Sequence, residues 1–375
     1  MRKLILRPHT FGLYRPSKSG DPLSNWWCHV RNFSRAAVRL ERKPSKPNNI
    51  RILMCRILEM TQLTSLVVGC YIHDSWRHFI DALPLLNAAW SHAPQLQQLS
   101  LHLPVECLDK VLETTPHLPL LEELHLSIWS ISSHPLFCQA TLITVATFIN
   151  RHSPSLIHLT IDIPTPNLDP SPLFLGIGQL PKILGIATEL SIQRLDPQGG
   201  GPVGKFLTKQ SVSLQELRFQ FYEPTLGERP TPSSFFSSSI FQVDFPALSS
   251  LELGLCYWDR TSEQSLASSI AQYLFKFRHT LTRLTIQGCI ISLPIIEAFV
   301  SALGEGAVLQ ELEMHVHYLS SDLLDILSRN LLRLRILDLT YSWLQYRDDV
   351  HWDPDLHFRS NNVRSPALVL YTMLG

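Results

Sequence analysis

Residues 248–256 read Leu-Ser-Ser-Leu-Glu-Leu-Gly-Leu-Cys, a motif in which Leu248 and Leu251 are separated by two free positions and Leu251 and Leu253 by one. Variants of this motif occur ten times, and successive copies begin 25 to 35 residues apart. They begin at Leu63, Leu96, Leu121, Leu156, Ala187, Leu214, Leu248, Leu281, Leu309 and Leu334. Such self-similarity is typical of a solenoid, in which each unit buries its apolar face only against its neighbours.

Apolar and free positions alternate within each motif, which is the period of a strand with one buried face. Between the motifs lie helical patterns, such as the i, i+4, i+7 spacing of Ile295, Phe299 and Ala302. We predict helices near residues 76–83, 105–112, 142–149, 265–277, 294–303 and 321–327. Two proline-rich stretches, 164–181 and 224–239, are interpreted as long loops. The sequence therefore predicts an α/β fold with a parallel sheet lining a curved array and helices outside.

The composition sets limits on the class of protein. Apolar residues make up 45% of the 375 and charged residues 17%, which favours a continuous core and excludes disorder. The seven cysteines are scattered without a Cys-x-x-Cys pair, which argues against a disulfide framework and a zinc site. Because no run resembles a secretory signal or a membrane span, we expect a cytoplasmic or nuclear protein.

The zero net charge hides two oppositely charged parts. Residues 1–56 hold 13 Lys/Arg and 2 Asp/Glu, so the remaining residues hold 19 and 30. We expect three regions. The first is a basic N-terminal segment at 1–56 that forms a first degenerate repeat or a cap, in which Met1, Leu4 and Leu6 would form a motif-like strand. A leucine-rich-repeat solenoid at 57–342 and a C-terminal cap or tail at 343–375 follow.

The basic segment 24–46 has a helical pattern of its own. Trp26, Val30, Phe33, Ala37 and Leu40 form an apolar stripe, beside which four arginines run at nearly the same spacing. The simplest interpretation is the outer helix of a first repeat. Binding of an acidic partner, a membrane surface or calmodulin remains an alternative, as does a mitochondrial transit peptide.

Cysteine at the ninth motif position indicates which class of known repeats the motif resembles. Cys256 and Cys289 occupy that position, and Cys70 falls one place early. This pattern resembles F-box-type leucine-rich-repeat proteins, in particular divergent, fungal-like members of the ribonuclease-inhibitor-like superfamily. The resemblance implies a right-handed solenoid, or horseshoe, with a parallel β-sheet on the concave face and helices on the convex face.

The same resemblance implies a function without catalysis. The chain would be a protein–protein interaction module, the substrate-recognition part of an F-box-like ubiquitin-ligase adaptor. Residues 1–62 contain no recognisable F-box. A Skp1-like linker is therefore expected as a partner only if an F-box exists upstream. A leucine-rich-repeat scaffold or inhibitor unrelated to ubiquitin is the alternative.

In such repeats the third, fifth and seventh motif positions face the concave surface, where polar side chains either contact a partner or only keep the sheet soluble. Eight of these thirty residues are acidic and two basic, which favours a basic or polar protein partner and disfavours nucleic acid. Their four histidines suggest pH-sensitive binding. We reject metal binding by them, because their positions along the strands do not align, and we expect no cofactor. The candidate contact residues are His102, Glu123, His125, His158, Asp162, Glu189, Glu216, Arg218, Glu252, Arg283, Glu311, Glu313, His315 and Asp338.

One stretch resembles a nucleotide-binding motif. Residues 199–205 match the Gly-x4-Gly-Lys part of a phosphate loop, but Phe206 stands where a magnesium-binding hydroxyl is needed and Pro202 removes a backbone N–H. A nucleotide-binding enzyme using Gly199–Lys205 is therefore a remote alternative. Without any other catalytic motif, we expect no catalytic residues and no enzyme.

Overall fold

The computed structural model describes residues 3–6, 47–60, 63–69, 76–130, 135–165, 168–191, 201–222, 231–255, 263–304, 306–344 and 367–371. The chain divides into two compact units, unit 1 at residues 1–182 and unit 2 at residues 183–375. Each unit is α/β. The region boundaries expected at residues 56 and 342 stay predictions. The basic segment 24–46, Cys70 and Cys256 lie outside the described residues.

Unit 1 alternates strands with helices. Its strands are β1 (Lys3–Leu6), β2 (Ser65–Gly69), β3 (Gln98–Pro104), β4 (Glu123–Trp129) and β5 (His158–Ile163). Its helices are α2 (Pro47–Leu58), α3 (Trp76–Ala89), the short 3-10 helix η3 (Trp90–Gln95), α4 (Val105–Thr114), α5 (Pro135–His152) and α6 (Ser171–Gly176). Strands β1 to β5 pair in chain order, and the pairings from β1 to β5 are parallel.

Unit 2 has the same plan with one addition. Its strands are β6 (Gly185–Ser191), β7 (Glu216–Tyr222), β8 (Ser250–Gly254), β9 (Arg283–Ile291), β10 (Glu311–Leu319), β11 (Ile336–Leu344) and β12 (Ala367–Tyr371). Its helices are α7 (Pro202–Gln210), α8 (Pro232–Phe236), α9 (Ser239–Gln242), α10 (Glu263–Phe275), α11 (Leu293–Leu303) and α12 (Ser321–Asn330). Strands β6 to β11 are parallel, and β12 pairs antiparallel with β11.

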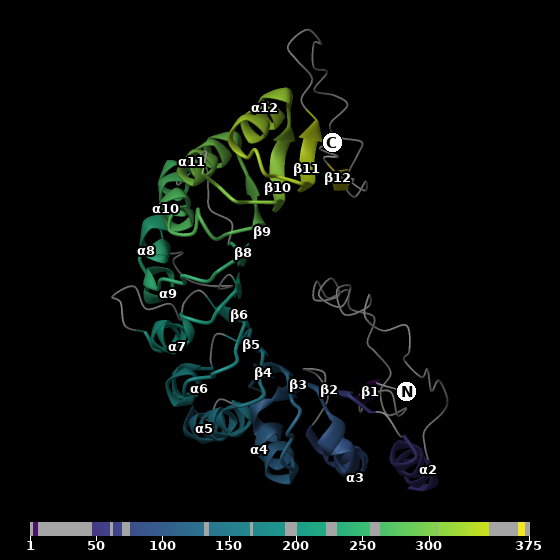
Figure 1. Cartoon of the computed structure of the whole chain (residues 1–375). Helices are drawn as coiled ribbons and strands as arrows, with labels where there is room; N and C mark the ends of the chain where they lie inside the picture. Colours follow the sequence, from purple (N-terminus) through teal and green to yellow (C-terminus); the bar gives the residue numbers. More distant parts are fainter. Residues whose placement is uncertain are drawn as a thin grey trace, which may run out of the picture. The chain divides into compact units, whose positions relative to one another are not determined.

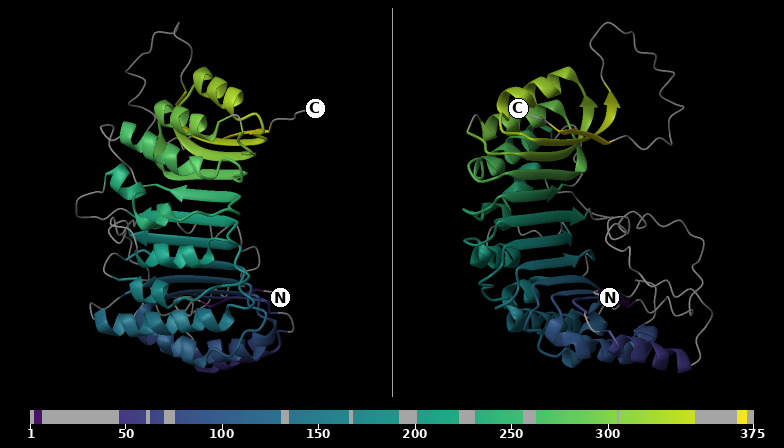
Figure 2. Two further views of the ribbon diagram at one scale, coloured as in Figure 1. Left: turned by 60° about the vertical axis from the view of Figure 1, so that its left-hand side comes forward. Right: turned by 45° about the vertical axis from the view of Figure 1, so that its right-hand side comes forward.

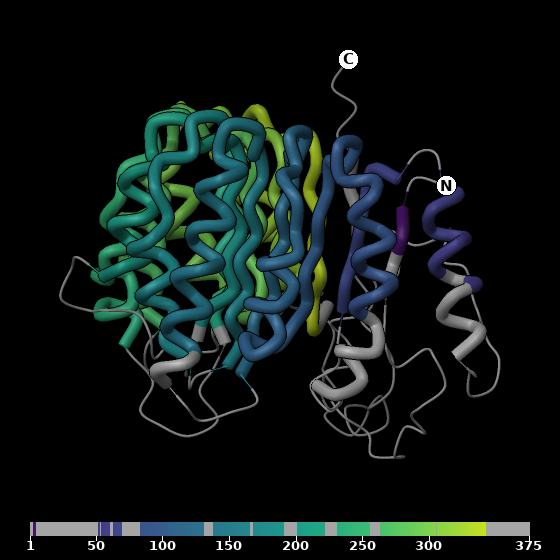
Figure 3. The backbone as a smooth tube through the Cα atoms, turned by 90° about the horizontal axis from the view of Figure 1, so that it is seen from below, coloured from purple at the N-terminus to yellow at the C-terminus, as the bar shows by residue number. Residues whose placement is uncertain are grey.

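In both units the helices lie on one side of the sheet (Figure 1), and the strands of unit 2 lie side by side like rungs (Figure 2). The backbone trace shows the same alternation of strand and helix (Figure 3). The motif leucines point toward the helices and are almost fully buried. Leu99, Leu124 and Leu284, for example, are at most 1% exposed. Burying a leucine side chain contributes roughly 1.5–3 kcal/mol to the free energy of folding. The rows of buried motif leucines therefore hold the sheet against the helices.

A repeated hydrogen-bond pattern defines the register of the repeats. At the starts of β3 to β5 and of β7 to β11, one carbonyl at the second position of the preceding motif accepts two N–H groups. Thr64 O, for example, accepts from Gln97 and Gln98 at 2.9 and 3.0 Å. The same carbonyl in the next strands of unit 1 belongs to Gln97 and Glu122. Because the pattern recurs at each of these strand starts, the repeats that contain them are structurally equivalent.

This register corrects one of the ten predicted motifs. Leu184 O is the carbonyl that accepts from Gln215 and Glu216, so the motif before β7 begins at Ile183 and not at Ala187. Ile186 stands in register with Leu217, and Thr188 with Phe219. The sequence pattern missed this because buried Thr188, 4% exposed, occupies the sixth position where other motifs have an apolar side chain.

Strand β1 is paired as the sequence suggested. Leu4 stands in register with Leu66, and Leu6 with Val68, so these two residues follow the motif spacing. Lys3 stands in register with Ser65, which places it on the face opposite the motif leucines.

The two proline-rich stretches are not simply loops, which corrects that prediction. The first contains α6, with Pro172 in its first turn, and the second contains α8, which begins at Pro232. Proline is tolerated in the first turn of a helix because the N–H it lacks would have no intrahelical partner there. Phe174, Phe235 and Phe236 anchor these helices in the core.

Among the described residues, no helix has the length and apolar character needed to cross a membrane. The four cysteines in the described part are free thiols, of which Cys107, Cys138 and Cys289 are buried and Cys55 is exposed. Burial raises the pKa of the Cys107 thiol to about 11, helped by the nearby carboxylate of Glu106. A buried thiol with a raised pKa is a poor nucleophile at neutral pH.

Candidate partner-binding surface

All fourteen candidate residues lie on strands. On each strand the side chains alternate, so residues at the third, fifth and seventh motif positions point away from the motif leucines. We call this side of each sheet its strand face. It is the side that the helices of the same unit leave uncovered (Figure 1).

The strand face of unit 1 contains a histidine–carboxylate cluster. His125 on β4 and Asp162 on β5 join through Nε2 and Oδ2 at 2.7 Å, with side chains 30% and 9% exposed. His102 on β3 meets His125 edge to face, with ring centroids 4.6 Å apart. Ser127, in register with both His102 and Asp162, is 6% exposed. We name His102, His125 and Asp162 the His–Asp cluster.

The other candidate residues of unit 1 stand beside this cluster. Glu123 is exposed and in register with His158, which is half-buried. Both belong to the third-position row, which also contains Gln98, Ser65 and Lys3. Among the described residues of β1 to β5, Lys3 is the one lysine or arginine on this face.

The strand face of unit 2 contains two cross-strand ion pairs. Arg218 Nε lies 3.0 Å from Glu252 Oε1, and Arg283 Nε lies 3.5 Å from Glu311 Oε2. In each pair the arginine and the glutamate are in register on neighbouring strands. Exposed pairs of this kind contribute at most about 1 kcal/mol. Both candidate arginines therefore already have an acidic neighbour, which leaves the face with an excess of carboxylates.

Further candidates in unit 2 differ in their exposure. Glu313 accepts a hydrogen bond from Thr285 Oγ1 at 3.2 Å, and Glu216 is exposed. Asp338 is half-buried. Glu189 is only 4% exposed, and Asp162 in unit 1 only 6%, so the structure removes both from the surface that a partner can reach.

His315 lies on β10 in unit 2. Its Nε2 is 3.2 Å from Ser342 Oγ on β11. Desolvation by burial, together with nearby His317, lowers the pKa of His315. The His315 imidazole is thus more readily neutral than an exposed histidine.

Sequence reasoning missed that two histidines meet. His102 is a seventh-position residue and His125 a fifth-position residue, so their positions along the strands differ, yet adjacent parallel strands bring the rings together. Diagonal neighbours across two strands lie within reach of long side chains, which is the signal that could have found them. Among the described residues, no group of three or more His, Cys, Asp or Glu has the arrangement to hold a metal ion.

The phosphate-loop-like stretch is helical where the structure describes it. Helix α7 begins at Pro202, and Lys205 N donates to Gly201 O at 3.0 Å. A Cβ on Gly204 would collide with Ser239, which explains glycine there by packing against α9. Residues 201–205 therefore form a helical turn in place of the open loop that cradles phosphate. Gly199 and Gly200 lie outside the described residues.

Comparison with known proteins adds no assignment, since no protein-family model matches the chain and no curated protein matches its sequence.

Proposed function

We propose that this chain is a protein-binding module that holds a basic or polar partner on its strand faces. The observation that carries this proposal is the repeated row of polar side chains that the helices leave uncovered, such as Ser100, His125 and Thr160 in unit 1. A surface built from one position of every repeat suits an extended partner. We assign the chain no chemical step.

Stacking of strand–helix units supports a right-handed horseshoe with the strands inside, which is part of the proposal. Strands repeat about every 4.8 Å, whereas packed helices need 8–10 Å, so a row of such units bends toward its strands. A parallel crossover through a helix is right-handed in about 98% of cases. The strand faces would then form the concave side.

The leucine-rich-repeat pattern supports a more specific role, the substrate-recognition part of an F-box-like ubiquitin-ligase adaptor in the cytoplasm or nucleus. Affinity purification of the full chain from its native cells tests this role. Recovery of a Skp1-like linker and a cullin would support the adaptor. Recovery of other proteins without them would contradict the adaptor and favour a scaffold or inhibitor.

The binding surface itself is tested by matched charge reversals. Glu123→Lys with Glu216→Lys changes one exposed glutamate on each strand face, and recovery of the partner should fall by about tenfold. Glu113→Lys with Glu297→Lys changes two exposed glutamates on α4 and α11 by the same total charge. Equal losses in both variants would contradict binding through the strand faces.

A further inference from the structure

The first repeat of unit 1 leaves one side of its helix uncovered. Strand β1 and helix α2 form this repeat, and α3 is the α-helix that packs against α2 within the described part of the chain (Figure 1). Ile52, Cys55 and Leu58 follow one another at intervals of three residues, so they lie on the same side of α2. Ile52 is 58% exposed, Leu58 is 53% exposed, and Cys55 is also exposed. We call these three residues the outer face of α2.

This outer face is apolar where a solenoid needs a polar end. A terminal repeat has no further repeat to cover it, so its outer side is normally polar. Arg56 and Glu59 meet that need, because they form an exposed ion pair at 2.9 Å. Ile52 and Leu58 do not, and α2 would be stabilised if another apolar surface covered them.

The chain between β1 and α2 contains such a surface. Residues 7–46 join these two elements, whereas residues 70–75 suffice between β2 and α3 and residues 130–134 between β4 and α5. Helix α2 occupies the outer-helix position that the sequence pattern suggested for 24–46, so the apolar stripe of 24–46 needs a different surface to pack against. The stripe consists of Trp26, Val30, Phe33, Ala37 and Leu40.

Connectivity holds this stripe close to the outer face of α2. Seven residue steps lead from Leu40 to Pro47, the first residue of α2, and a fully extended chain of that length spans at most roughly 25 Å. Helix α2 itself is about 18 Å long. A short tether of this kind gives an effective concentration of about a millimolar. The arginines of the segment lie outside the stripe, so they remain in solvent when the stripe is buried.

We propose that the outer face of α2 is the docking site of residues 24–46 of the same chain, which pack their apolar stripe against Ile52, Cys55 and Leu58 and so cover the open end of unit 1. The occupant is this segment because it is tethered directly to α2, whereas any other molecule would have to compete with a millimolar effective concentration. The contact is independent of the strand faces and of the proposed function.

Reactivity of the Cys55 thiol tests this contact in the full chain. Labelling with N-ethylmaleimide, followed by mass spectrometry of the peptide that contains Cys55, gives the labelling rate at one pH. We expect a rate at least about tenfold below that of a synthetic peptide of residues 50–60, because the docked stripe excludes the reagent. Val30→Asp places a charge in the stripe and should raise the rate about fivefold. Val38→Asp adds the same charge outside the stripe and should leave the rate unchanged.

A second pair of variants tests the surface on α2. Ile52→Gln should also raise Cys55 labelling severalfold, whereas Ile143→Gln, at a residue of α5 that is 54% exposed, should not. Circular dichroism confirms that each variant is folded. Full reactivity of Cys55 in the wild-type chain would overturn the proposal, as would equal rates in Val30→Asp and Val38→Asp. Slow labelling that is lost on dilution would overturn it as well, because it would identify a second copy of the chain as the occupant.

Discussion

At the scale of single residues, His152 shows how the fold sets a protonation state. Its side chain is 1% exposed, its Nδ1 donates to Phe148 O at 2.9 Å and its Nε2 accepts from Leu118 N–H at 3.2 Å. This pair of hydrogen bonds requires the neutral ring. Desolvation by burial lowers the pKa of His152 to about 4, with smaller contributions from Arg151 and His117.

Protonation of His152 should therefore destabilise the protein in acid. Because the pKa is lower in the folded than in the unfolded chain, the stabilisation is complete above about pH 6.5 and is lost as the pH falls toward 4. We expect about 2 kcal/mol less free energy of unfolding at pH 5 than at pH 7 from this group. Urea unfolding of His152→Gln should show a smaller pH dependence, whereas His117→Gln, at the exposed stacked ring, should keep it. An unchanged slope in His152→Gln would refute this assignment.

Gly288 meets a backbone constraint on β9. Its φ is +83°, and a Cβ there would collide with the carbonyl oxygen of Leu255. The pairing between β9 and β10 shifts register next to it. Only glycine suits a site with positive φ and so close an approach.

Gly288→Ala should lower the free energy of unfolding by roughly 2–4 kcal/mol. Gly304 also has a positive φ, +69°, but no atom would lie closer than 3.7 Å to an added Cβ. Gly304→Ala should therefore lower the free energy of unfolding by less, and its effect measures the backbone strain alone. Gly69→Ala, with its nearest atom at 3.9 Å and no positive φ, should be nearly neutral. Equal losses at Gly288 and Gly304 would show that the collision with Leu255 is relieved. Denaturant titrations give all three values.

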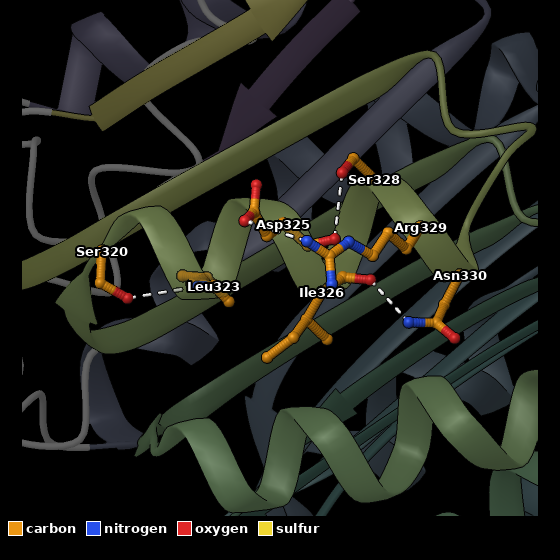
Figure 4. A network of polar contacts seen from close by, with 7 residues as sticks. All are labelled: Ser320, Leu323, Asp325, Ile326, Ser328, Arg329 and Asn330. Carbon is orange, nitrogen blue, oxygen red and sulfur yellow. Dashed lines mark hydrogen bonds and ion pairs between the residues drawn. The ribbon is translucent and has the colours of Figure 1, made fainter.

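At the scale of elements, helix ends show where local sequence is decisive. Ser320 caps α12, because its side chain accepts the N–H of Leu323 at 3.2 Å (Figure 4). The last turn is closed by Asn330, whose Nδ2 donates to Ile326 O at 2.8 Å, and Arg329 pairs with Asp325 at 3.4 Å (Figure 4). Helix α11 begins after Ser292 without such a cap, since within the described structure the buried Oγ of Ser292 has no hydrogen-bond partner.

Two matched serine variants test this difference. Ser320→Ala should cost about 1 kcal/mol of unfolding free energy, the usual value of a side-chain cap. Ser292→Ala should be neutral or slightly stabilising, because it removes a buried hydroxyl without a partner. Chemical denaturation measures both, and a larger loss for Ser292→Ala than for Ser320→Ala would contradict the cap assignment.

At the scale of the whole molecule, the proposed binding depends most on charge. With histidines counted as neutral, the described strand face of unit 1 has two carboxylates and one lysine, and that of unit 2 has more carboxylates than the two that pair with Arg218 and Arg283. Interactions between exposed charges are screened over about 8–10 Å at physiological salt. Partner binding should therefore depend on ionic strength.

Raising the salt from about 0.05 M to about 0.5 M should lower partner recovery severalfold. The helix-side variant Glu113→Lys/Glu297→Lys should retain this salt dependence, whereas Glu123→Lys/Glu216→Lys should have less of it. Pull-downs in a salt series measure the effect. Recovery that is independent of salt would indicate an apolar interface in place of the charged strand faces.

Much of the fold was predictable because its signal is local. The spacing of the motif leucines predicted nearly all strands, and the helix after β3, expected at 105–112, spans Val105–Thr114. The prediction failed at β6, where buried Thr188 breaks the apolar pattern, and at α6 and α8, where proline at a helix start reads as loop. In both cases contacts with neighbouring repeats provide the free energy that stabilises the element. These contacts cannot be inferred from the local sequence.

The candidate surface was likewise predictable only in part. By itself the sequence determined which residues share the strand faces, because side chains alternate on a strand whatever surrounds it. Only the tertiary structure decided that His102, His125 and Asp162 meet, that Arg218 and Arg283 have acidic neighbours, and that Glu189 is buried. The physical reason is that contacts across strands depend on register, and register is set by the packing of whole repeats.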